Sequence, residues 1–93
     1  MHTLIHVIIL LGVSLFVSHV SAAPADAMLL FVQHCASCHG MDRLGAMGPA
    51  LLPDNLSRLR KKVAREVVVN GRPATQMPAF GETLDDAQID ALV

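Results

Sequence analysis

Two cysteines followed directly by a histidine, in the segment CASCH, constrain this chain more than any other feature. They are Cys35, Cys38 and His39, and the chain has no other cysteine. The segment matters because 93 residues make one domain at most, with three Phe and no Trp or Tyr to fill its core. A domain this small usually needs a disulfide, a metal or a bound cofactor to complete its interior.

The N-terminal segment differs in composition from the rest of the chain. Residues 4–17 form an apolar run, and small residues follow it. This pattern is typical of a secretory signal peptide cleaved after Ala22, although residues 1–6 lack the usual Lys or Arg. We therefore expect residues 1–22 to be removed and residues 23–93 to form the domain in a bacterial periplasm. Retention as a membrane anchor is the alternative.

Charge excludes one class of partner and suggests another. All seven Lys and Arg and all eight Asp and Glu lie after the predicted leader, so the domain also has a net charge of −1. It therefore lacks the excess of basic residues that is typical of nucleic-acid-binding proteins. A basic cluster nevertheless stands out, made of Arg58, Arg60, Lys61, Lys62 and Arg65. It is either a docking patch for an acidic redox partner or a solvated helix face opposite Leu56, Leu59 and Val63.

Three helices are predicted, and no segment favours a strand convincingly. The first covers residues 25–35. The second can be capped by Asn55 and ends at Asn70-Gly71, a good helix stop. The residues expected to form the buried faces are Met28, Leu29, Phe31 and Val32 in the first helix and Leu56, Leu59, Val63 and Val67 in the second.

The third predicted helix starts after Asp85 and runs to Val93. Asp85 and Gln88 match a capping box, and Leu84 and Ile89 are placed for a hydrophobic staple. Because this helix is still running at the last residue, we expect the sequence to be a piece of a longer one.

The pattern C-x-x-C-H is the attachment pattern for c-type haem. The thiols of Cys35 and Cys38 would add to the two vinyl groups of one porphyrin, and His39 would lie beneath its iron. Three other interpretations remain. A thioredoxin-like redox pair needs a βαβ context, and a zinc site needs a fourth ligand, for which only the poorly placed His34 is left. A plain structural disulfide is the third.

The sixth iron ligand is expected from a methionine far from His39. The methionines after the predicted leader are Met28, Met41, Met47 and Met77. The first is most simply a core residue of its helix, and the next two follow the attachment site closely. Met77 lies in the Pro-containing loop 71–82, which can reach the opposite face of the ring. His39 and Met77 would fill both axial positions and leave no open site for substrate. A sensor that releases Met77 to bind a gas is a weaker alternative.

With these motifs in place, the sequence resembles the class I c-type cytochromes. A first helix running into CASCHG is followed by Gly48-Pro49-Ala50-Leu51, Met77-Pro78-Ala79-Phe80 and a closing helix, over residues 25–93. The resemblance implies a small all-α fold wrapped around one covalent haem c, with the closing helix crossing the first. It also implies that the Pro49 carbonyl accepts a hydrogen bond from His39 and that Leu51 packs on the haem.

A narrower resemblance covers residues 42–92, which are similar to the cytochrome c domain at the front of the haem d1 proteins of denitrifiers. In that family, nitrite reductases and dehydrogenases of haem d1 biosynthesis carry a β-propeller after the c domain. Two functions follow. The chain is an electron carrier with no catalytic residue of its own, or it is the electron-entry domain of a larger haem d1 enzyme.

Overall fold

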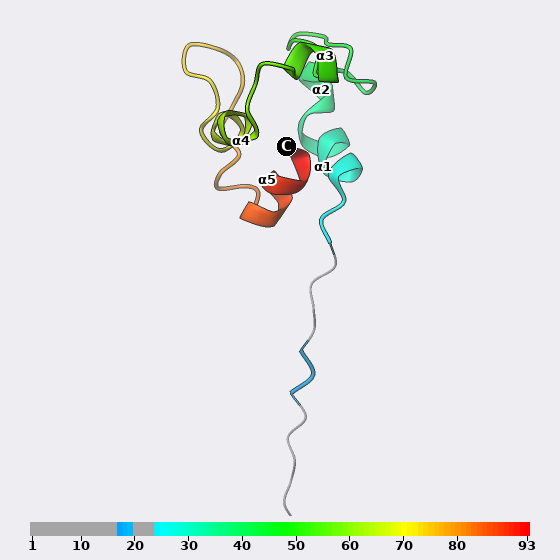
Figure 1. Ribbon diagram of the computed structural model, residues 1–93, viewed down its shortest axis with the longest axis vertical. Coiled ribbons are helices and arrows are strands. Elements are labelled where there is room, and N and C mark those ends of the chain that lie inside the picture. Colours follow the sequence, from blue (N-terminus) through cyan, green and yellow to red (C-terminus); the bar gives the residue numbers. More distant parts are fainter. Residues whose placement is uncertain (1–16, 20–23) are drawn as a thin grey trace, which may run out of the picture.

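The computed structural model describes residues 17–19 and 24–93, so the predicted leader lies almost entirely outside the described residues. The helices are α1 (Ala27–His34), α2 (Ala36–His39), α3 (Pro53–Leu56), α4 (Lys61–Asn70) and α5 (Asp86–Leu92). The described residues contain no strand, which confirms the all-α prediction. In Figure 1, α1 and α5 lie side by side, α2 follows α1, and α4 packs against α5. In this part of the chain, no helix has the length and apolarity needed to cross a bilayer.

The buried face of α1 differs from the predicted one. Leu30 and Phe31 are buried, whereas Met28 is 62% exposed and Leu29 and Val32 are also exposed. The assignment of Met28 to the core was therefore wrong. The physical reason is that residues 28–32 are all apolar, so their sequence defines no stripe. The position of α5 decides which side of this short helix is covered.

The second predicted helix is two helices. Pro53 occupies the first turn of α3, and α4 starts only after Arg60, whose backbone is extended (φ −67°, ψ 143°). Between them the Ser57 hydroxyl donates a hydrogen bond to the Asp54 carbonyl (3.0 Å), a local bond that competes with helix continuation. Asn55 lies inside α3 and is not a cap, so that prediction was wrong. The stop at Asn70-Gly71 is confirmed.

The packed core lies between α1 and α5. Asp85 and Gln88 form the predicted capping box. The Asp85 carboxylate accepts a hydrogen bond from the backbone amide of Gln88 (2.8 Å), and the side-chain oxygen of Gln88 accepts one from the backbone amide of Asp85 (2.9 Å). Leu84 and Ile89 flank this cap and pack with Leu30, and Ile89 is only 1% exposed. The closing helix therefore packs against the first, as the family resemblance implied.

One side chain ties α4 to α5. The Arg65 guanidinium binds the carboxylates of Asp86 (2.5 Å) and Asp90 (2.9 Å). Hydrogen bonds to Asp90 and Asp86 raise the pKa of Arg65 further above its ordinary value. Arg65 therefore has a structural role. Its charge is paired with two carboxylates, so it is not a free cation of the basic cluster.

Candidate functional site

The two cysteines and the histidine are brought together by a single short turn. Cys35 ends α1, where its amide donates to the Phe31 carbonyl (2.9 Å), and it also precedes α2. Its own carbonyl accepts hydrogen bonds from the amides of Cys38 (3.2 Å) and His39 (2.9 Å). Gly40, with φ of 84°, then ends α2. Both thiols are free and partly buried, so the turn presents them separately rather than as a disulfide.

The His39 ring is held in one orientation. It is 9% exposed, and its Nδ1 lies 2.8 Å from the Pro49 carbonyl oxygen. Because a carbonyl can only accept, Nδ1 carries the proton and Nε2 keeps a free lone pair. The hydrogen bond implied by the family resemblance is therefore present, and it leaves Nε2 available to a metal.

Gly48 makes this arrangement possible. A Cβ atom at Gly48 would lie 2.9 Å from Cε1 and 3.0 Å from Nδ1 of His39. The Gly48 amide donates to the Cys38 carbonyl (2.7 Å), which pins the Pro49 segment against α2. The sequence places Gly48 in a motif, but only the structure shows that the imidazole fills the space where a side chain would stand.

Arg43 is a second residue that sequence reasoning missed. Its guanidinium carbon lies 4.3 Å from the centroid of the Phe31 ring, a cation–π contact. Its backbone is left-handed (φ 63°), and its carbonyl accepts from the Leu51 amide (2.9 Å). A positive φ at a non-glycine residue has no clear signature in a single sequence, so nothing pointed to this role.

The environment of Cys35 argues against the alternative thiol chemistries. Burial raises the pKa of the Cys35 thiol, and the nearby Arg43 charge only partly opposes this. A thiol with a raised pKa is a poor nucleophile, unlike the activated cysteine of a redox pair. Within residues 17–19 and 24–93, no three His, Cys, Asp or Glu side chains gather as a metal site would require.

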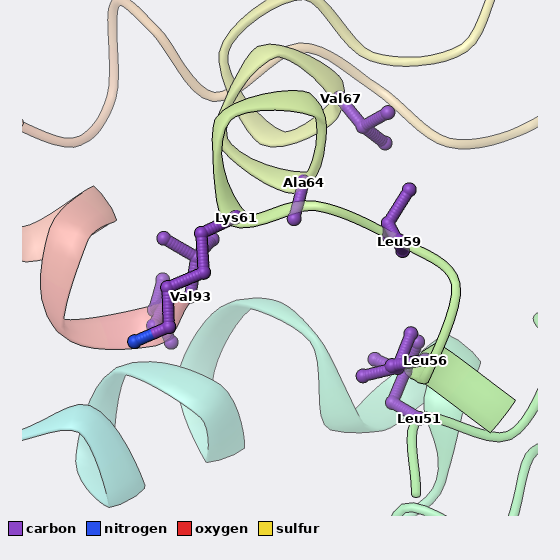
Figure 2. Close-up of a pocket in the computed structure, with 8 residues that line it drawn as sticks. Leu51, Leu56, Leu59, Lys61, Ala64, Val67 and Val93 are labelled. Carbon is purple, nitrogen blue, oxygen red and sulfur yellow. The ribbon is translucent and has the colours of Figure 1, made fainter. Parts of the chain in front are cut away.

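A hollow lies between α4 and the opposite wall of the molecule, with a volume of about 170 Å³ (Figure 2). Its walls come from the Leu51 segment, α3, α4 and the end of α5. The lining residues are Leu51, Leu56, Leu59, Lys61, Ala64, Val67, Leu92 and Val93. In Figure 2, Val67 and Ala64 come from α4, while Leu51 and Leu56 lie together across the space. Contact with an apolar group would bury these side chains more fully, so the lining favours an apolar occupant.

The loop that carries Met77 doubles back onto α4. The Met77 carbonyl accepts from the Arg72 amide (3.2 Å), and the Met77 amide donates to the Thr75 hydroxyl (3.2 Å). At the end of the loop, the Phe80 amide donates to the Val68 carbonyl (2.9 Å). Gly71 allows this close return, because a Cβ there would lie 2.7 Å from the Met77 carbonyl oxygen.

Exposure separates the four candidate methionines. Met28, Met41 and Met47 are exposed, and Met77 is partly buried in its loop. A thioether that is to bind iron must be held in the interior rather than in solvent. Among the methionines of residues 24–93, Met77 is the one that is partly buried.

Comparisons with known proteins agree with this chemistry. The family model described as cytochrome c oxidase, cbb3-type, subunit III matches residues 22–93. The dihydro-heme d1 dehydrogenase of Pseudomonas aeruginosa is 59% identical over 71 residues, which are 76% of this chain and 14% of that protein. Cytochrome c55X of Stutzerimonas stutzeri is 39% identical over 84 residues, covering 85% of this chain and 74% of that protein.

Two solved structures are similar in fold. Dihydro-heme d1 dehydrogenase NirN in complex with DHE has a TM-score of 0.70 and 57% identity over 75% of this chain and 15% of its own. The c-type cytochrome NirC has a TM-score of 0.63 and 35% identity over 70% of this chain and 75% of its own. The chain thus spans about a seventh of the dehydrogenase and three quarters of the small cytochromes.

Proposed function

Because this chain belongs to the family of c-type cytochrome domains that the cbb3-type subunit III model describes, we propose that it carries electrons on an iron bound by His39 and Met77. The chain binds one haem c covalently through Cys35 and Cys38 and exchanges electrons with redox partners. The haem supplies one-electron chemistry, since its iron changes between the ferric and ferrous states. The protein supplies the axial ligands, the apolar surroundings and the surface on which a partner docks.

The observation that carries this proposal is the hydrogen bond from His39 Nδ1 to the Pro49 carbonyl, at 2.8 Å. It fixes the tautomer and orientation of the ring before iron is bound. It also makes Nε2 a better donor, because the hydrogen bond draws the Nδ1 proton toward the carbonyl. A buried histidine prepared in this way beside two free thiols fits an axial ligand better than a structural core residue.

Met77 would supply the second protein ligand to the iron. Its loop is anchored to α4 by backbone hydrogen bonds, so the thioether is presented by a defined segment. A thioether is a weaker donor than imidazole and stabilises ferrous iron relative to ferric iron, which raises the reduction potential. With two protein ligands the iron would have no vacant position, which would suit electron transfer and exclude substrate binding at the metal.

Leu51 and the other apolar residues of the hollow fit the flat face of the macrocycle. They would exclude water from it. Low polarity around the iron disfavours the additional positive charge of the ferric state and raises the potential further.

The ligand assignment is tested by replacing Met77 with Ala in the haem-loaded protein. The haem should stay attached through Cys35 and Cys38, the weak far-red ferric sulfur-to-iron band should vanish, and carbon monoxide should bind the ferrous form readily. Met77→His should stay low-spin with a lower potential, because imidazole stabilises ferric iron more than a thioether does. Met41→Ala and Met47→Ala are the matched controls. A far-red band lost in Met47→Ala and kept in Met77→Ala would refute the assignment.

A second candidate function is the electron-entry domain of a larger haem d1 enzyme. The 59% identity with dihydro-heme d1 dehydrogenase favours it. The similarity to cytochrome c55X over 74% of that protein favours a separate carrier. The reading frame beyond Val93 discriminates the two: an in-frame propeller domain of several hundred residues would establish the enzyme, and a stop codon within a few helical turns would establish the carrier.

The proposal extends to location and partner. We propose that residues 1–22 are a cleaved leader, that the mature domain works in the periplasm, and that its redox partner docks near the segment from Arg58 to Arg65. Mass spectrometry of the mature protein tests the first point. A chain beginning at Ala23 is expected, and a chain that retains the apolar run and partitions with membranes would show an anchor.

A further inference from the structure

The connection between α3 and α4 carries four cations that have no partner in the described residues. They are Arg58, Arg60, Lys61 and Lys62, all exposed, and the ion pairs found in residues 17–19 and 24–93 belong to Arg65 alone. The two acids nearest in sequence, Asp54 and Glu66, form no ion pair with them. The basic cluster seen in the sequence therefore divides into a structural arginine and a free basic strip, residues 58–62.

The positions of these cations do not favour the stability of α4. Arg60 is the N-cap of α4 and provides no side-chain cap, Lys61 and Lys62 occupy the first turn, and that turn holds no acid. Cations at a helix N-terminus oppose the helix dipole, whose positive end lies there. Like charges in adjacent positions repel one another as well. A stabilising role would favour the opposite residues.

Two residues of the strip also line the hollow. Leu59 and Lys61 belong to its lining, and Figure 2 shows Leu59 on the connection and Lys61 where α4 begins. Leu59 is 41% exposed, so one apolar side chain between two arginines reaches both the hollow and solvent. An apolar centre with a charged rim is a common composition for transient protein interfaces.

We propose that residues 58–62 form the docking surface for an acidic redox protein and that electrons cross near Leu59. Complementary charge would speed encounter with such a partner and orient its acidic face over the hollow. The inference rests on the proposed function, because it needs the haem to occupy the hollow. It goes beyond that function by assigning the partner chemistry and by excluding Arg65 from the surface.

The test uses haem-loaded protein in the ferrous state and two small oxidants of opposite charge, ferricyanide and the tris(phenanthroline)cobalt(III) cation. Each takes one electron from the ferrous iron, leaving ferric iron and ferrocyanide or the cobalt(II) complex. Lys62→Gln and Arg60→Gln should slow oxidation by the anion, leave oxidation by the cation equal or faster, and flatten the salt dependence for the anion. The rate of electron transfer to a blue-copper protein with an acidic docking face should fall as the rate with the anion does. The fall should be larger when Arg60→Gln and Lys62→Gln are combined.

Gln33→Glu is the matched control, since it changes the net charge by the same −1 at an exposed position of α1. If Gln33→Glu slows the anionic reactions as much as Lys62→Gln does, net charge is responsible and the docking inference is wrong. Arg60→Lys keeps the charge and should retain the wild-type rate, so the test stands even if a neutral variant accumulates poorly.

Two other results are informative. If the strip variants lose binding to phosphatidylglycerol vesicles but react normally with the blue-copper protein, the surface binds membrane and the inference is overturned. If the wild type exchanges electrons with neither oxidant, the proposed function itself fails. Wild-type reactivity with equal rates in all variants would overturn the docking surface alone.

Discussion

The two sides of this small domain bury their apolar side chains in different ways. Between α1 and α5, Leu30, Leu84 and Ile89 pack against one another and are almost inaccessible to water. Across the molecule, Leu59 and Val63 are exposed, and apolar side chains from α3, α4 and the connection between them line a hollow. The first side is completed by protein atoms, and we expect the haem to complete the second.

This difference explains how a chain with so few aromatic residues folds. The packed side is too small to offset the entropy of ordering the whole domain, because small domains bury a low fraction of their surface. We expect the porphyrin to supply the remaining burial, which would couple folding to cofactor attachment. Changes on the packed side should therefore affect stability, and changes on the haem side should affect both stability and potential.

The largest effect is expected when both attachment points are removed. Cys35→Ala with Cys38→Ala should give a protein whose haem is extracted by acid-acetone, whereas wild-type haem should resist extraction. Without the porphyrin, the hollow side has nothing to pack against, so thermal unfolding followed by circular dichroism should lose its cooperative transition. An apo-protein with a well-dispersed NMR spectrum and a cooperative unfolding transition would show that the α1–α5 core is enough for folding. The proposed difference between the two sides would then be wrong.

The next largest effect is expected in the packed core. Ile89→Ala should lower the free energy of unfolding of the haem-loaded protein by about 2–5 kcal/mol, because it deletes methyl groups from the most buried side chain. The reduction potential should hardly change. Met28→Ala is the control and should cost no more than about 0.5 kcal/mol, since that residue is 62% exposed. If a denaturant titration shows equal losses of unfolding free energy for the two variants, the buried helix face predicted from the sequence would be correct.

How much the sequence predicts also differs between the two sides. The CASCH motif, the Asp85–Gln88 cap and the Leu84–Ile89 staple are short-range signals, and the structure contains each of these elements. The break between α3 and α4 was missed because apolar residues at helical spacing continue through it, while the Ser57 hydroxyl bond and the extended backbone of Arg60 interrupt the helix.

The missed parts of the site depend on contacts between distant segments. Arg43 gains its role from a left-handed backbone and from the ring of Phe31, and Gly48 gains its role from the imidazole that lies against it. Neither contact has a period or a spacing that a sequence displays. The hydrogen bond from His39 to Pro49 was expected only through the family resemblance.

A smaller effect is expected where the attachment turn meets the Pro49 segment. Gly48→Ala would place a methyl group 2.9 Å from Cε1 of His39, so the ring must shift and its bond to the Pro49 carbonyl must weaken. A cost of about 1–3 kcal/mol is typical of such overpacking. The potential should change too, and the Nδ1 proton resonance should exchange faster in NMR spectra. Pro49→Ala keeps the carbonyl and is the control. An unchanged potential and proton resonance in Gly48→Ala would mean that the hydrogen bond does not control the ligand.

The smallest effect is expected at the cap of α5, and it separates the two sides most cleanly. Asp85→Ala removes the carboxylate that accepts from the Gln88 amide and leaves that donor without its partner, at a cost of about 1 kcal/mol. Asp85→Asn keeps an acceptor oxygen at the cap and should retain most of the stability. Because this cap lies at the opposite end of α5 from Leu92 and Val93, which line the hollow, the loss should be the same in the ferric and ferrous proteins, and the potential should match the wild type. Denaturant titrations in both oxidation states measure this. A loss that depends on oxidation state would show that α5 transmits strain to the iron, and the packed and haem-completed sides would then have to be treated as one unit.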